Sequence, residues 1–312
     1  MHVHALNVAV DFPSTVRLLV LALLWGSSFT FIKMSLEGLS PAQVVLFRLA
    51  LGALLLLGFA AVRGVRLPAH GRTWLLIAVA AALGNVIPFL LLSYGEQTAT
   101  AGVAGALVGA TPLLTLGLAA AFIPAERLGR GVVLGLVVGF LGVLLVVAPW
   151  RDFDTSVVGS LACLGAAVSY AAGFVFVRKH LSPLQIPALS LAAAQTLAAT
   201  ALQGPLTPLL GWEQPDLTTR VVGAMLALGL LGTGSAYILY FRLIADVGAS
   251  RASSVNYVVP VVAVALGVAA LGEPVTWHLV AGGAMVLVAM AMARRQPASA
   301  PSPRPAGAGV LR

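Results

Sequence analysis

Residues 131–149 read GVVLGLVVGFLGVLLVVAP, an apolar run without a charged side chain. Folded as an α-helix with a rise of about 1.5 Å per residue, this run is long enough to cross a hydrocarbon core roughly 30 Å thick. Runs of similar length recur along the chain, at about 17–36, 42–62, 73–94, 99–122, 131–149, 157–177, 186–204, 221–241, 251–271 and 276–293. The sequence therefore predicts an all-α integral membrane protein with ten transmembrane helices.

The composition of the 312-residue chain excludes several other classes of protein. It is 60% hydrophobic and only 9% charged, against about 25% charged residues in an average soluble domain. The net charge of +8 would suggest nucleic acid binding in a soluble protein, but the basic residues lie in short loops and tails, so no nucleic acid partner is expected. The single cysteine, Cys163, lies within an apolar run, so no disulfide framework, metal site or cofactor is predicted.

Lysine and arginine residues predict the orientation, because cytoplasmic loops of membrane proteins are enriched in them. With a cytoplasmic N-terminus, 14 of the 18 basic residues fall in cytoplasmic segments. These are Arg17, Arg63, Arg66, Arg72, Arg127, Arg130, Arg178, Lys179, Arg242, Arg251, Arg294, Arg295, Arg304 and Arg312. Lys33, Arg151 and Arg220 fall outside, and Arg48 lies within the second span. An even number of spans with both termini in the cytoplasm follows.

Sequence landmarks recur in the same order in the two halves of the chain. Each half has a Ser-Pro pair after its first span, a proline 11 residues after a small-residue turn, and then a short loop with a glutamate. The pairs are Ser40-Pro41 and Ser182-Pro183, Ala101 to Pro112 and Ala249 to Pro260, and Glu126 and Glu273. Because five spans is an odd number, the second half must enter the membrane in the opposite sense, and such inverted repeats commonly surround a midplane transport site. Chance likeness between Leu-, Ala- and Gly-rich helices is the alternative.

Several short motifs resemble a known family. They are Leu24-Trp25-Gly26-Ser27-Ser28-Phe29, Phe47-Arg48, and the stretch from Gly95 through Thr111-Pro112 to Glu126-Arg127. With the doubled five-helix layout, they resemble the EamA-type proteins of the drug/metabolite transporter superfamily over about residues 14–294. The resemblance implies ten helices, a bacterial inner (plasma) membrane location with both termini cytoplasmic, and transport of small organic solutes, often amino acids or drug-like metabolites.

The predicted organisation has two repeats between two tails. Residues 1–13 form an N-terminal tail, 14–150 the first EamA-like five-helix repeat, and 156–294 the second, inverted one. Residues 295–312, rich in Pro, Ala, Ser and Gly, are expected to form a disordered cytoplasmic tail.

Polar and aromatic residues near the membrane midplane form the predicted solute site, because such side chains are costly at that depth unless they face a cavity or a partner. Counting along each span gives the substrate-binding set Trp25, Asn85, Thr111, Tyr170, Thr233, Tyr237, Asn256 and Tyr257. An aromatic and amide lining suits a neutral or zwitterionic organic solute. The alternatives are that the aromatic rings only pack between helices and that Asn85 bonds across them.

Two charged residues are predicted to matter. Arg48 lies roughly 9 Å below the outer surface by its position in the span. It could attract an anionic group of the solute, pair with Glu96 or Glu37, or snorkel to the interface. Glu96, at the outer end of the third span, could bind a proton if desolvation raised its pKa, or it could be a solvated helix-end residue.

Prolines and glycines within the spans have two interpretations each. Pro88, Pro112 and Pro260 remove backbone hydrogen bonds and kink their helices, either as hinges or only to shape the bundle. The glycines of residues 131–139 form a close-packing face, which could join a homodimer or only neighbouring helices.

The predicted function is secondary transport of a small organic solute, favouring export, by alternating access around a midplane cavity. A membrane-embedded enzyme would need clustered histidines or paired carboxylates in the bundle. The five histidines lie in tails or at span ends, so the protein is predicted not to be an enzyme. A lipid-carrier flippase or a non-transporting sensor is the remaining alternative.

Overall fold

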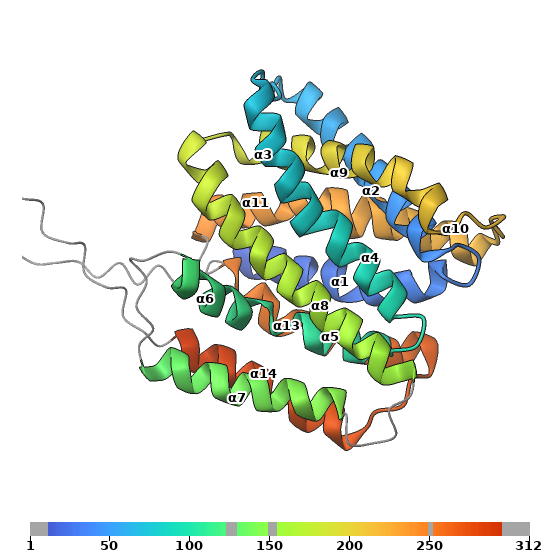
Figure 1. Cartoon of the computed structure of the whole chain (residues 1–312), viewed down its shortest axis with the longest axis vertical. Coiled ribbons are helices and arrows are strands. Elements are labelled where there is room, and N and C mark those ends of the chain that lie inside the picture. Colours follow the sequence, from blue (N-terminus) through green and yellow to red (C-terminus); the bar gives the residue numbers. More distant parts are fainter. Residues whose placement is uncertain (1–11, 123–129, 149–154, 249–251, 295–312) are drawn as a thin grey trace, which may run out of the picture.

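The computed structural model describes residues 12–122, 130–148, 155–248 and 252–294, and within these ranges every regular element is a helix. The helices form one bundle (Figure 1). They are α1 (Phe12–Ser35), α2 (Pro41–Val62), α3 (Gly71–Ala81), η1 (Ala82–Val86), α4 (Ile87–Gly95), α5 (Ala101–Val108), α6 (Thr111–Phe122), α7 (Arg130–Val147), α8 (Thr155–Phe176), η2 (Val177–Leu181), η3 (Ser182–Leu184), α9 (Ala188–Gly211), α10 (Thr219–Leu226), η4 (Ala227–Ser235), α11 (Ala236–Val247), α13 (Val255–Leu271) and α14 (Trp277–Arg294). The predicted tail 295–312 and the loop with Glu126 lie outside the described residues.

Many of these helices suit a bilayer. Seven helical stretches are long and apolar enough to span a membrane, and Val255–Leu271 and Trp277–Ala293 are shorter apolar helices. The 24-residue α9 is not among the seven, because polar side chains such as Gln195 and Gln203 interrupt its apolar sequence. The prediction of an all-helical, multi-pass membrane protein is confirmed for the described residues, whereas the count of ten spans stays a prediction.

The main contacts between helices correspond in the two halves of the chain. The contact of α1 with α13 corresponds to the contacts of α8 with α5 and α6 in the other half. In the same way, the contact of α4 with α8 corresponds to those of α1 with α10 and α11, and the contact of α2 with η4 corresponds to that of α9 with α3. The pairs α2–α9, α5–α13 and α7–α14 each join one helix to its own equivalent. Exchanging the halves therefore turns each of these main pairs into another of them or into itself, as a doubled architecture requires.

The third and eighth predicted spans both depart from α-helical geometry near their middles. The π-helical segment η1 interrupts the stretch Gly71–Gly95, and η4 interrupts Thr219–Val247. Segments with i→i+5 hydrogen bonds are rare and are frequent at functional sites. These two segments carry Asn85 and Thr233 into the interior, where both side chains are buried.

The predicted fourth span, 99–122, is two helices rather than one. α5 ends at Val108, a turn follows, and α6 begins at Thr111. At Gly109 an added Cβ would lie 2.7 Å from Cγ of Pro260. Only glycine allows α13 to approach this closely, so the turn and Pro260 of the other half pack directly together.

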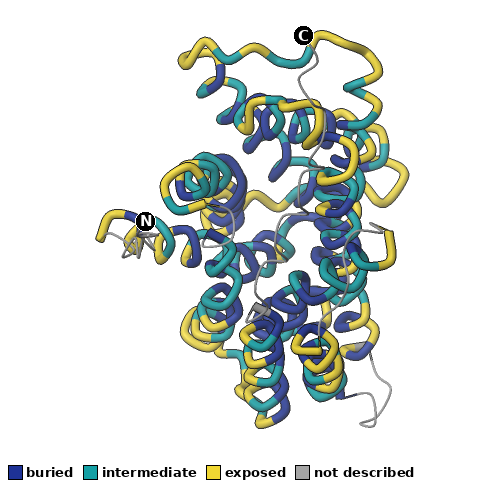
Figure 2. The backbone as a smooth tube through the Cα atoms, turned by 90° about the vertical axis from the view of Figure 1, so that its left-hand side faces the viewer, coloured by how far each residue is buried: buried dark blue, intermediate teal, exposed yellow. Residues whose placement is uncertain are grey.

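The glycine-rich face of α7 packs within the chain. An added Cβ at Gly135 would lie 2.8 Å from the carbonyl oxygen of Ala289, and one at Gly142 would lie 2.8 Å from that of Gly282. α7 and α14 run side by side at one edge of the bundle (Figure 1). Buried residues follow the inward faces of the helices (Figure 2), while Phe140 and other apolar side chains point outward, as in helices that face lipid.

Loops from both halves interlock at one end of the bundle. Ser40 begins α2 with a capping box, in which its side chain and that of Gln43 satisfy each other's backbone N–H groups. Ser40 Oγ also donates to the carbonyl oxygen of Gly211 over 2.7 Å, and Gln43 Nε2 donates to that of Glu213 over 2.7 Å. These contacts close this end, called here the Lys33 end after the lysine that also lies there.

Candidate solute-binding site

Arg48 lies inside the bundle and is 6% exposed. Its Nε donates a hydrogen bond to Oγ1 of Thr233 over 2.9 Å, and its guanidinium lies 3.7 Å from the ring centre of Phe89. Thr233 Oγ1 donates in turn to the carbonyl oxygen of Leu228 over 3.1 Å, which fixes its orientation on η4. A hydroxyl oxygen and an aromatic face are weak compensation for a buried cation, so the described contacts neutralise the charge only in part.

The other expectations for Arg48 do not hold in this structure. Its burial excludes snorkelling to the interface. Glu37 pairs with Arg220 instead, with 3.2 Å between their charged atoms. Among the described residues, no carboxylate, including that of Glu96, lies within ion-pair distance of Arg48.

A chain of amide and phenol groups lies on helices of both halves. Gln195 on α9 donates to Oδ1 of Asn85 over 2.8 Å, and Asn85 Nδ2 donates to the hydroxyl of Tyr237 over 3.3 Å. Gln195 also donates to the carbonyl oxygen of Ala80 over 3.4 Å. Asn85 therefore makes the interhelical bonds that were one interpretation of its depth. Gln195 was missed, although the same count along the span places it near the midplane.

Aromatic rings surround these polar groups. Tyr170 meets Phe89 edge to face with 6.2 Å between ring centres, and Trp25 packs against Tyr240 at 5.1 Å. Phe89 thus contacts both Arg48 and Tyr170. Neither Phe89 nor Tyr240 was predicted, because the sequence does not distinguish a ring that faces the interior from one that faces lipid.

Other predicted site residues lie elsewhere. Thr111 donates to the carbonyl oxygen of Val108 over 2.6 Å and so supports the break between α5 and α6. Asn256 and Tyr257 are half-buried near the start of α13. Pro88 lies near the start of α4, directly after η1, and Pro260 lies inside α13. The residues that the structure joins are Arg48 with Thr233, and Asn85 with Tyr237 and Gln195, called here the central cluster.

Glu96 does not lie in solvent, as one of the two interpretations expected of this helix-end residue. It follows α4 directly, is 1% exposed, and neither carboxyl oxygen has a hydrogen-bond partner in the described structure. The interpretation of a solvated residue is therefore wrong, and the interpretation of a proton site stays a prediction.

Two pockets of the described structure lie away from the central cluster. One of about 360 Å³ is lined by residues that include Arg66, His70, Gln185 and Ser190, where the α2–α3 and η3–α9 connections meet. Another, of about 340 Å³, lies between α3 and α9 and includes Trp74 and Leu202. Neither includes a residue of the central cluster.

Known proteins resemble this chain over nearly its whole length. YdfC of Bacillus subtilis, described as an uncharacterized transporter, is 32% identical and the match covers 85% of each chain. A probable terminal-alkyne amino-acid exporter of Streptantibioticus cattleyicolor is 28% identical over 84% of this chain and 86% of its own. A crystal structure that is 24% identical matches with a TM-score of 0.64 over 90% of this chain and 96% of the other, which supports the fold.

The EamA-like transporter family matches residues 15–148 and 157–295, once in each half. The two matched segments are the two halves whose main helix contacts correspond. The relatives above are named as transporters or exporters. The predictions of the family and of a transporter rather than an enzyme are thereby confirmed. This chain belongs to the EamA-like transporter family of the drug/metabolite transporter superfamily.

Proposed function

We propose that this protein is a secondary transporter of a small organic solute that bears a carboxylate, such as an amino acid or a related metabolite. Arg48 carries the proposal. A guanidinium has five N–H donors, and the described contacts use one, from Nε to Thr233. The remaining donors match the two oxygens of a carboxylate, which arginine binds bidentately.

The rest of the central cluster supplies groups for the remainder of the solute. Asn85, Gln195 and Tyr237 offer hydrogen-bonding amide and hydroxyl groups, and the Trp25–Tyr240 pair offers an aromatic surface. In this structure Gln195, Asn85 and Tyr237 bond to one another, so the solute would have to replace some of these internal bonds. Such replacement favours solutes that reproduce the lost hydrogen bonds.

The transport cycle would use the doubled architecture. Ten spans with both termini cytoplasmic, in the bacterial inner membrane, place the two repeats (14–150 and 156–294) in opposite orientations. The equivalent packing pairs support this arrangement, because rocking one half against the other then opens the site to each side alternately. Export is the proposed direction, and the relative named as an amino-acid exporter supports both the direction and the solute class.

Transport into everted membrane vesicles tests the proposal. Vesicles from cells that overproduce the protein are expected to accumulate members of a mixture of ¹⁴C-labelled protein amino acids, and Arg48→Gln should abolish that accumulation. Arg220→Gln is the matched control, because Arg220 is half exposed and pairs with Glu37 at the Lys33 end. Amines that lack the carboxylate should not compete with the labelled amino acids.

Two results would contradict the proposal. Unchanged accumulation by folded Arg48→Gln protein would remove the carboxylate site. Scrambling of labelled phospholipid in reconstituted vesicles, without movement of amino acids, would instead identify a flippase. Thermal unfolding of the purified variants in detergent separates loss of transport from loss of folding.

A further inference from the structure

Glu96 is a buried carboxyl that the proposed solute site does not use. It is among the largest side chains that are fully buried, and both of its oxygens lack a hydrogen-bond partner in the described structure. An ionised carboxylate in such a place loses its hydration without compensation, and the usual response of a carboxyl is to become neutral. This geometry therefore favours the protonated, neutral form of the Glu96 side chain.

The neighbouring helix seals this site. α4 packs so closely on α8 that an added Cβ at Gly95 would lie 2.7 Å from Sγ of Cys163 and 2.7 Å from the carbonyl oxygen of Gly159. Cys163 is itself fully buried. Next to Glu96, the chain is thus packed directly on backbone and a thiol of α8, neither of which neutralises a negative charge.

Charged groups from three other elements act on Glu96. They are Lys33 on α1, Arg48 on α2 and Glu273 in the α13–α14 connection. Burial raises the pKa of Glu96, one residue beyond the span Gly71–Gly95, well above its usual value. Lys33 and Arg48 oppose that rise, and Glu273 adds to it.

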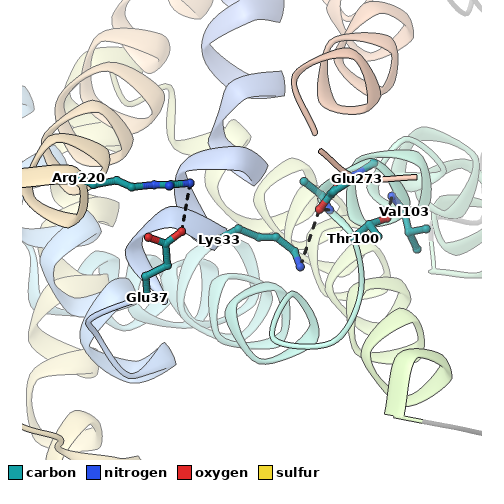
Figure 3. A network of polar contacts seen from close by, with 8 residues as sticks. Lys33, Glu37, Thr100, Val103, Arg220 and Glu273 are labelled. Atoms are coloured by element: carbon teal, nitrogen blue, oxygen red, sulfur yellow. Dashed lines mark hydrogen bonds and ion pairs between the residues drawn. The ribbon is translucent and has the colours of Figure 1, made fainter. Parts of the chain in front are cut away.

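Glu273, at the same end of the bundle, has the partners that Glu96 lacks. Its two oxygens accept hydrogen bonds from the backbone N–H groups of Ala101 and Gly102, over 2.8 and 3.2 Å. These groups are at the N-terminus of α5, where a negative charge is favourable. Lys33 Nζ lies 3.8 Å from Oε1 of Glu273 (Figure 3). Lys33 is therefore already paired, and Glu96 has no equivalent partner.

We propose that Glu96 is a proton-binding site: its carboxyl carries a proton in the closed arrangement seen here and releases it to water when the Lys33 end opens. With the site open, water and a Lys33 freed from Glu273 stabilise the carboxylate. The bundle cannot close again over an ionised Glu96 without burying an unpaired charge. Each closure therefore takes up one proton.

Coupling of this step to transport rests on the proposed function. If closure requires the proton, then the pH of the solution at the Lys33 end biases the cycle. Glu96→Gln, a neutral side chain of the same shape, is expected to close without a proton and so to lose its response to that pH.

Infrared spectroscopy of the full-length protein in lipid vesicles tests the proton site without any solute. The wild-type spectrum at pH 7 should contain a neutral-carboxyl band that Glu96→Gln removes. Glu37→Gln is the matched control, because Glu37 is half exposed and paired with Arg220, and it should leave the band unchanged. If Glu96→Gln leaves the neutral-carboxyl region unaltered, Glu96 is ionised and the proposal is wrong.

Vesicle transport tests the coupling separately, with the same ¹⁴C-labelled amino acid mixture. Glu96→Gln should retain exchange of labelled for unlabelled amino acids, but its exchange rate should no longer depend on the pH of the solution at the Lys33 end. A pH dependence of exchange by Glu96→Gln equal to that of the wild type would overturn the coupling and leave the proposed function intact. Absence of any amino acid movement in the wild type would overturn the proposed function, while the infrared band would still decide the proton site.

Discussion

The centre of the bundle and its α7–α14 edge are held together by opposite means. At the edge, Gly135 and Gly142 bring two helix backbones into direct contact without polar side chains. In the centre, Arg48, Asn85 and Gln195 join the halves through single hydrogen bonds between side chains. Backbone contact of the first kind has one good arrangement, whereas side-chain bonds of the second kind can be exchanged for bonds to a solute.

This difference suggests a division of roles between two sets of equivalent helices. The pair α7–α14 joins the last helix of one half to the last of the other, and the pair α2–α9 joins the second helices. α7 and α14 are uninterrupted α-helices. The helices around Asn85 and Thr233 contain π-helical segments, whose irregular hydrogen bonding is easier to rearrange. We expect the edge to act as a scaffold and the centre to move.

The largest effect is expected where the centre holds a charge. Thr233→Val removes the described acceptor of the Arg48 Nε–H and should cost about 1.5–3 kcal/mol, the range for hydrogen bonds to charged groups. Thr200→Val is the control, because the Thr200 hydroxyl bonds only to Thr196 on its own helix. Equilibrium unfolding in mixed detergent micelles measures both. Equal losses in the two variants would show that the Arg48 contact contributes little.

The second effect concerns the edge. Gly142→Ala adds a Cβ 2.8 Å from the carbonyl oxygen of Gly282 and should lower the free energy of unfolding by about 1–3 kcal/mol, as overpacking does. Gly283→Ala on α14 adds a Cβ with nothing within 4 Å and should be neutral or stabilise by up to about 1 kcal/mol, because alanine is the better helix former. The same unfolding measurement distinguishes the two signs. A destabilising Gly283→Ala would mean that a second chain covers this face.

The positions of the helices could be predicted closely from the sequence. The second run, predicted as 42–62, is the helix Pro41–Val62, because the thickness of the bilayer determines the length of an apolar run and Ser-Pro marks its start. The interruptions could not be predicted. The break after Val108 depends on the approach of Pro260 to Gly109, a contact between residues far apart in the sequence.

The candidate site was predicted only in part for a related reason. Counting residues gives depth in the membrane, and it correctly selected Asn85 and Thr233 as buried residues. Depth does not reveal which neighbours a side chain meets. Glu96 lies at the end of its span, yet its side chain is fully buried. Gln195 lies at the right depth but was not selected, and its role follows only from the position of Asn85 on η1.

The smallest effect is expected between the two amides of the central cluster. A double-mutant cycle with Asn85→Ala and Gln195→Ala isolates their 2.8 Å hydrogen bond from the other changes that each substitution makes. Hydrogen bonds between transmembrane helices average about 0.6 kcal/mol in such cycles, and we expect a coupling free energy of unfolding near that value. If the centre moves during transport, this weak coupling has a function, because a strong bond would hold the halves in one state. A coupling of several kcal/mol would instead make the centre as rigid as the α7–α14 edge and contradict the division of roles.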